Sequence, residues 1–222
     1  MREFWSEYGA LLLEGTVDTL AMTIIPTLFA YVLGLPLGVI LVLTKRDGLL
    51  PARHFNSVFG ALINILRSLP FMILMIFVIP FTRLIAGTSI GSTASMVPLV
   101  IAAAPFIARM VETSLEEVDA NIIEAARCMG ANNLQIVVRV ILKESVPSLL
   151  RGLSISIITI LGYTAVTGAM GAGGLGNIAY RYGYQRYQLD VMYVTILLLL
   201  VIVCVVQGVC SLLARQLDKR NR

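Results

Sequence analysis

Residues 191–214 read VMYVTILLLLVIVCVVQGVCSLLA, a run without a single charged side chain. A helix needs about 20 apolar residues to cross the roughly 30 Å hydrocarbon layer of a bilayer, so this run is long enough to span it. Within lipid the backbone must satisfy its own hydrogen bonds, and a continuous apolar run of this length does so as a helix. Three further charge-free runs of spanning length occupy residues 19–44, 84–108 and 152–180.

A fifth span is expected from the charge-free run 68–82, which reaches spanning length if its helix begins near Ser57 and Arg67 lies at an interface. The composition agrees, because 58% of the residues are hydrophobic and only 14% are charged, against about 25% charged in soluble domains. We therefore predict an all-α membrane protein with a single domain over residues 1–222. Its five helices are expected at about 17–43, 57–80, 91–111, 148–170 and 190–213.

The basic side chains predict the orientation of these helices, because cytoplasmic loops carry an excess of Lys and Arg. If the N-terminus lies outside, the residues that face the cytoplasm are Lys45, Arg46, Arg53, Arg67, Arg109, Arg127, Arg139, Lys143, Arg151, Arg215, Lys219, Arg220 and Arg222. Only Arg2, Arg83, Arg181 and Arg186 then face outward. Five crossings place the C-terminus in the cytoplasm, where its basic tail acts as a topology anchor rather than a nucleic-acid site.

The longest polar segment covers residues 112–146, and a loop of that length usually has its own structure and a function. Asn121 with Glu124 three residues later resembles a capping box at the start of a helix. Gly130 suits the left-handed position that ends such a helix, and Asn132 or Asn133 can cap a second one. The segment is predicted to form a helix, a turn and a helix on the cytoplasmic face.

This segment carries a family resemblance. The pattern Glu124-Ala125-Ala126-x3-Gly130 resembles the EAA loop of type I ABC importer permeases, in which nine residues and then I-x-L-P follow the glycine. The corresponding positions here are Val140, Leu142 and Lys143, and Lys143 in place of proline is a departure that leaves the end of the second helix open. Pro147 follows four residues later.

The resemblance implies that the loop inserts into a groove on a separate ATPase subunit. The residues implied in docking are Glu124, Ala125, Ala126, Arg127, Met129 and Gly130. It also implies two copies of the chain, two ATPase subunits, an external substrate-binding protein and a bacterial inner membrane. The chain would be a transport subunit without catalytic residues or a metal, with ATP and Mg²⁺ used by the partner, and it contains no G-x-x-x-x-G-K-[ST] motif. The alternative is an ordinary amphipathic surface helix.

A second resemblance concerns the substrate. Residues 162–165, GYTA, and residues 168–184, GAMGAGGLGNIAYRYGY, resemble the end of the fourth helix and the outer loop of methionine-uptake permeases. The outer-loop residues singled out are Gly171, Gly173, Gly174, Gly176, Tyr182 and Tyr184. The resemblance implies transport of D- or L-methionine by alternating access. Another small amino acid or metabolite, or a carrier that works without ATP, remains the alternative.

Polar side chains inside a span usually face the bundle interior or a cavity, which predicts that the fourth helix lines the passage. The predicted passage and gate residues are Tyr163, Thr164, Val166, Thr167 and Met170. Alternatively, the hydroxyl groups bond back to carbonyls of their own helix. The glycines also fit G-x-G-x-x-G, but that dinucleotide motif requires a strand before it, so a turn that closes the external gate is favoured.

Two further patterns concern helix geometry. Arg67 and Pro70 place a charge and a helix breaker together, which predicts a kink in the second helix, either fixed or movable. Gly34-x-x-x-Gly38 in the first helix favours close approach of a neighbouring helix. The outer tyrosines fit an interfacial belt, or contact with the external binding protein.

Overall fold

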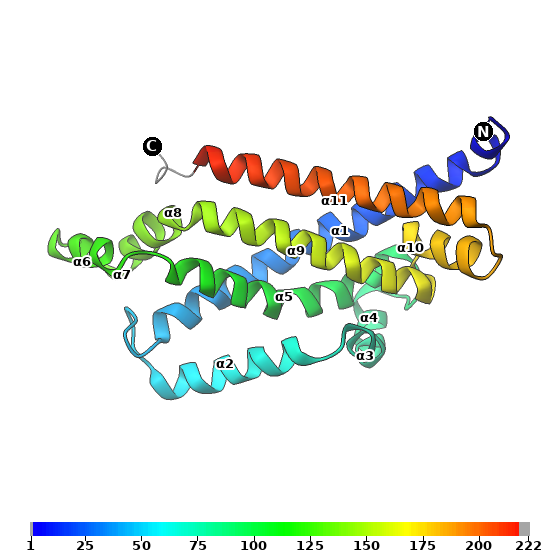
Figure 1. Ribbon diagram of the computed structural model, residues 1–222. Helices are drawn as coiled ribbons and strands as arrows, with labels where there is room; N and C mark the ends of the chain where they lie inside the picture. Colours follow the sequence, from blue (N-terminus) through cyan, green and yellow to red (C-terminus); the bar gives the residue numbers. More distant parts are fainter. Residues whose placement is uncertain (1, 218–222) are drawn as a thin grey trace. The chain divides into compact units, whose positions relative to one another are not determined.

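The computed structural model describes residues 2–217 (Figure 1). Its side chains are described from Phe4 onward. The predicted topology anchor at Lys219, Arg220 and Arg222 therefore lies outside the described residues. The helices are α1 (Arg2–Thr44), α2 (Arg53–Ser68), α3 (Phe71–Phe77), α4 (Ile79–Ala86), α5 (Ser92–Glu116), α6 (Ala120–Cys128), α7 (Asn133–Gln135), α8 (Leu142–Glu144), α9 (Val146–Thr167), α10 (Gly174–Ile178) and α11 (Leu189–Leu217). Three π-helical segments join some of them: η1 (Ile136–Ile141), η2 (Gly168–Ala172) and η3 (Ala179–Tyr184).

The chain divides into two compact units. Unit 1 consists of Met1–Ala30, Leu69–Ala103 and Ile157–Val206, and unit 2 consists of Tyr31–Ser68, Ala104–Ser156 and Gln207–Arg222. The helices α1, α5, α9 and α11 contribute residues to both units, whereas the polar segment with α6 and α7 belongs to unit 2 alone.

Four stretches are long and apolar enough to cross a membrane: Phe4–Thr44, Ser92–Glu116, Val146–Ala172 and Leu189–Leu217. The interrupted pair α2 and α3 adds a fifth if it is counted as one span. Burial separates these stretches, because 56% of the most apolar window in Ser92–Glu116 is buried but only 6% of that in Leu189–Leu217. The window in α5 is therefore the most buried of the four, and α11 offers most of its surface to lipid or to a partner.

The first helix differs from the prediction of about 17–43, because α1 begins at Arg2. The reason is tertiary: Phe4, Tyr8 and Leu11 pack against the buried cluster of Leu12, Leu175, Ile178 and Val191 in unit 1. The residues at the start of α1 thus pack against an apolar surface that their own sequence does not predict. Pro26 and Pro36 lie within the helix without ending it.

The second predicted helix, 57–80, is replaced by α2, α3 and α4. Pro70 has φ −57° and ψ 128°, so the chain leaves the helical conformation there instead of bending through it. Proline lacks the N–H that a helix interior needs and disfavours the helical conformation of the residue before it, here Leu69. Arg67 is exposed in the last turn of α2.

The other predicted spans differ mainly at their ends. The helix expected at 91–111 continues to Glu116, and the one expected at 190–213 continues to Leu217. The helix expected at 148–170 is α-helical only as far as Thr167 and then becomes the π-helical turn η2, in which Gly171 has φ +95°. Glycine adopts positive φ at little cost, which lets the chain reverse at this point.

Unit 2 is built around the close contact of α1 with α5. A Cβ added to Gly34 would lie 2.7 Å from Cγ2 of Ile107, and one added to Gly38 would lie 2.6 Å from the carbonyl oxygen of Ala108. These distances are shorter than any ordinary carbon contact, so both positions require glycine. The buried residues Leu41, Ile63 and Ala108 extend this packing to α2.

Candidate functional site

The helix α6 is the first helix that lies wholly within the polar segment, and its cap differs from the prediction. Asp119, not Asn121, is the N-cap, with φ −60° and ψ 127°, and its Oδ1 accepts a hydrogen bond from the N–H of Asn121 at 2.9 Å. The carboxylate of Asp119 precedes the first helical turn and reaches an otherwise unpaired amide, which is the usual role of a capping side chain. Glu124 is thereby left exposed on the surface of α6.

The turn after α6 has the hydrogen bonds of a Schellman motif. The N–H of Ala131 donates to the carbonyl of Ala126 at 3.1 Å, and the N–H of Gly130 donates to that of Arg127 at 2.9 Å. Gly130 has φ +80°, the left-handed conformation that this motif requires. α7 starts directly afterwards with a full capping box, in which Asn132 and Gln135 exchange two hydrogen bonds of 2.9 and 3.0 Å.

Exposure divides the predicted docking residues. Ala126 is buried at 4% exposure, whereas Glu124, Ala125, Arg127, Met129 and Gly130 are exposed. Met129 is 82% exposed, and Leu134, in the next helix, is 73% exposed.

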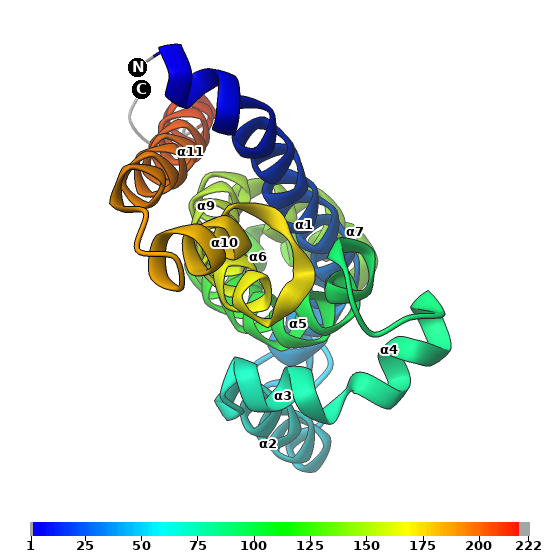
Figure 2. The ribbon, with the colours of Figure 1, turned by 90° about the vertical axis from the view of Figure 1, so that its right-hand side faces the viewer.

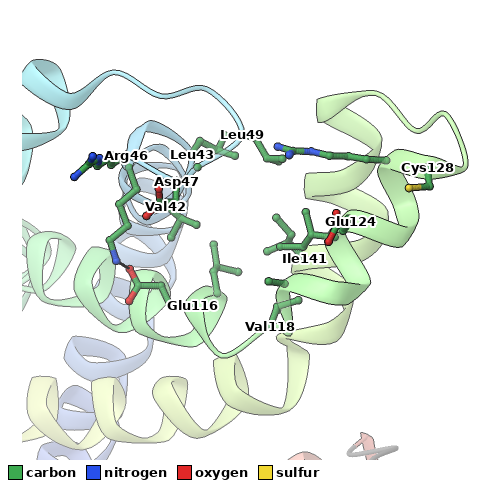
Figure 3. A pocket seen from close by; sticks show the side chains of 16 residues that line it. Val42, Leu43, Arg46, Asp47, Leu49, Glu116, Val118, Glu124, Cys128 and Ile141 are labelled. Atoms are coloured by element: carbon green, nitrogen blue, oxygen red, sulfur yellow. Dashed lines mark hydrogen bonds and ion pairs between the residues drawn. The ribbon is translucent and has the colours of Figure 1, made fainter.

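A cavity of about 1010 Å³ lies beside α6 in unit 2 (Figure 3). Its walls come from the end of α1, the loop 45–49, the end of α5 and α6. Lys45 and Glu116 form an ion pair that joins the loop to α5, and Figure 3 shows Glu124 on the wall that α6 provides. No local sequence pattern reveals that this loop faces α6.

The glycine-rich turn lies in unit 1, between α9 and α11 (Figure 2). Gly171, Gly173 and Gly174 all have positive φ, of 95°, 90° and 74°. The N–H of Leu175 donates to Oγ1 of Thr19 at 2.8 Å in a fully buried contact. No strand occurs among residues 2–217, so the glycines do not form the βαβ turn of a dinucleotide site.

This turn also packs against its own neighbours. A Cβ on Gly176 would lie 2.7 Å from the backbone of Ala165, and the side chain of Asn177 donates to the carbonyl of Gly168 at 2.9 Å. The end of α9 is thus held tightly against the chain that follows it.

The predicted gate residues do not share one environment. Thr164 and Thr167 are buried, and their hydroxyl groups donate to the carbonyls of Leu161 at 2.7 Å and Thr164 at 2.9 Å. This is the back-bonded arrangement named as the alternative. Val166 and Met170 are partly exposed, at 37% and 39%.

Tyr163 is half-buried and stacks on Phe71 of α3, with ring centroids 4.4 Å apart and an angle of 9° between the planes. Phe71 was not singled out from the sequence as a passage residue, since only the fold brings it to α9.

The outer tyrosines form contacts in unit 1. Tyr182 meets Tyr8 of α1 edge to face, and the guanidinium of Arg186 lies 4.6 Å from the centre of the Tyr182 ring. Tyr184 is 66% exposed and stacks on Tyr180. Tyr182 therefore anchors the loop, while Tyr184 is open to a partner or to the membrane interface. No group of three or more His, Cys, Asp or Glu residues that could hold a metal occurs among the described residues.

These elements define a class. Several apolar helices long enough to span a bilayer, with a capped polar helix–turn–helix between α5 and α9, are the architecture of a multi-span membrane protein with a structured polar segment. The family model described as "Binding-protein-dependent transport system inner membrane component" matches residues 34–222, and the chain belongs to this family. The expected family is thereby confirmed, and the chain is a transport component of the inner membrane.

Individual relatives are similar along most of their length. The "Probable D-methionine transport system permease protein MetI" of Vibrio cholerae is 46% identical over 95% of this chain and 93% of its own. The "Methionine import system permease protein MetP" of Bacillus subtilis is 44% identical over 82% of each chain. A solved structure of the "MetNI methionine ABC transporter" in an inward-facing conformation matches with a TM-score of 0.94 and 45% identity, covering 96% of this chain and 99% of that one.

Proposed function

We propose that this chain is the membrane-spanning permease subunit of an ATP-driven importer for methionine, in the D or L form. Two copies form the passage, and two ATPase subunits on the cytoplasmic side supply the energy by hydrolysing ATP with Mg²⁺. An external binding protein delivers the substrate. The names of the relatives and their identity of 44–46% support this function and this substrate.

The observation that carries the docking part of the proposal is the exposed turn around Gly130. A well-capped helix with a Schellman end is rigid in itself, because its terminal amides and carbonyls are paired. Such a turn, with Met129 almost fully exposed, suits insertion into a groove of another protein. Glu124, Ala125 and Arg127 complete the surface that would enter the groove, with Ala126 supporting it from behind.

Gly130 allows a sharp test, because no atom lies within 4 Å of a Cβ placed there. A side chain at this position therefore has no close contact within the chain. Its effects are limited to backbone strain and to a clash with the docked partner. Asparagine tolerates the left-handed conformation better than other side chains do. Gly130→Asn should keep the turn yet obstruct the groove, whereas Gly130→Ala adds backbone strain with little bulk.

The experiment is co-purification of each variant with its ATPase from membranes, followed by methionine-driven ATP hydrolysis in lipid. We expect the wild-type chain to co-purify with the ATPase and Gly130→Asn to lose most of this binding. The melting temperature of the isolated Gly130→Asn subunit should stay close to that of the wild type. Full binding and uptake by Gly130→Asn would contradict docking at this turn. Uptake by the chain without any ATPase would contradict the proposed function as a whole.

The passage is proposed along the end of α9 and the following η2, where Tyr163, Val166 and Met170 are at least partly exposed. Thr164 and Thr167 would then support the gate from inside, holding the helix in shape by their bonds to its own carbonyls. Gly171 and Gly173, at the start of the glycine turn, would let the gate move, whereas Gly174 and Gly176 fit close contacts that hold the following chain in place. Cysteines at 163, 166 and 170 should react with a water-soluble thiol reagent to different extents with and without ATP, and equal reactivity would reject this part.

A further inference from the structure

Two ion pairs lie at the end of α5 and a third just beyond it, and the three differ in exposure and distance. Lys45–Glu116 is exposed, at 51% and 38%, and Arg151–Glu117 is both exposed and 4.0 Å long. Exposed pairs of this kind contribute little to holding two helices together. Arg109–Glu112 is different, because its side chains are only 21% and 11% exposed and its Nη1–Oε2 distance is 2.6 Å.

The Arg109 guanidinium also reaches a second helix. Its Nη2 donates to the carbonyl oxygen of Gly60 in α2 at 2.7 Å, while Nη1 donates to Glu112. The planar fork of arginine serves two acceptors in fixed directions at once, which a lysine ammonium does not reproduce. The buried Nε has no hydrogen-bond partner among the described residues, so the side chain is committed to these two contacts.

Gly60 makes this contact possible. It is buried, and a Cβ placed on it would lie 3.2 Å from Nη2 of Arg109 and 3.7 Å from Cδ2 of Leu41. A Cβ here would press on Nη2, so the guanidinium or α2 would have to shift by a few tenths of an ångström and the hydrogen bond to the Gly60 carbonyl would be disturbed. The lack of a side chain at Gly60 therefore leaves room on α2 for the guanidinium of Arg109.

The same helix leads straight to the proposed docking segment. α5 continues without a break from Arg109 to Glu116, and Asp119 already caps α6. The eight residues from Arg109 to Glu116 rise about 10 Å along the axis, at 1.5 Å per residue. Only residues 117–119 separate the end of α5 from α6, so Arg109 and α6 are joined by a short stretch of chain that is mostly helical.

We propose that Arg109 is the positioning residue that transmits movement of the docked helix α6 to α2, with Gly60 as its contact on α2 and Glu112 as its orienting partner. This inference rests on the proposed function, since only an attached ATPase would move α6. α2 then moves together with α5 during each cycle.

The test uses the complex of the chain with its ATPase and binding protein, reconstituted in liposomes with labelled methionine. Gly60→Ala and Arg109→Lys are compared with Lys45→Gln, which removes an exposed pair at the same end of α5. The measured quantity is methionine taken up per ATP hydrolysed. We expect this ratio to fall about two- to thirtyfold in the first two variants, the range typical of coupling positions, and to stay unchanged in Lys45→Gln.

The outcomes separate the two proposals. If the wild-type complex does not form or shows no ATP-dependent uptake, the proposed function fails. If the wild-type complex transports but Gly60→Ala and Arg109→Lys keep the wild-type ratio, the coupling role is wrong. Equal loss of hydrolysis and uptake, or failure of both variants to assemble while Lys45→Gln assembles, would also overturn it, because a purely structural contact would behave in that way.

Discussion

The buried hydrogen bond between Thr19 and Leu175 should decide how firmly the glycine turn is held to α1. Oγ1 of Thr19 accepts the N–H of Leu175 at 2.8 Å and donates to the carbonyl of Gly15 at 2.8 Å. Thr19 is 1% exposed and Leu175 is fully buried. Thr19→Val keeps the shape but removes the acceptor, so the N–H of Leu175 is left without a partner away from water.

A buried donor without a partner costs about 1–3 kcal/mol. Thr27→Val is the matched control, because Thr27 is also buried in α1 and its hydroxyl donates to the carbonyl of Thr23 at 2.6 Å, with no long-range partner among residues 2–217. That carbonyl still has its helical partner after the substitution. The difference between the two variants therefore isolates the long-range bond from the loss of a hydroxyl group.

Hydrogen exchange followed by mass spectrometry on the purified protein in lipid nanodiscs measures this difference. If exchange follows local opening, the amides of residues 174–178 in Thr19→Val should exchange about 5 to 150 times faster than in Thr27→Val, since 1.4 kcal/mol corresponds to a factor of ten. Equal protection of this segment in the two variants would refute the reasoning.

Two further changes test the turns of the two units. Gly174→Ala should lower the melting temperature more than Gly171→Ala. Both positions have positive φ and lose about 1–2 kcal/mol to backbone strain, but the added Cβ would lie 2.7 Å from Oγ1 of Thr19 at Gly174 and would meet nothing within 4 Å at Gly171. Equal melting temperatures would show that the contact with Thr19 relaxes freely. Asp119→Ala should cost about 1 kcal/mol of α6 stability, and Asp119→Asn should cost much less, because asparagine also caps well. We expect the amide of Asn121 to exchange faster in the alanine variant alone. Identical exchange in both variants would contradict the capping role.

Local chemistry made several features predictable. Charge-free runs of spanning length mark α1, α5, α9 and α11 because the bilayer fixes a minimum length for an apolar helix. Gly130 and Asn132 mark a turn because left-handed backbone and helix caps each favour a small set of residues. The capping preference did not identify the right residue at the start of α6, because Asp119 rather than Asn121 is its N-cap.

The sequence by itself therefore determined the membrane class, the polar helix–turn–helix and the glycine turn, all of which depend on residues close together in the chain. Tertiary structure alone decided that α1 extends back to Arg2, that Thr19 meets Leu175, and that Arg109 holds Gly60. Each of these joins residues far apart in sequence, and the physical reason is common to them. The partner of a buried polar group or apolar face is set by tertiary packing, and the residues adjacent in sequence do not specify it.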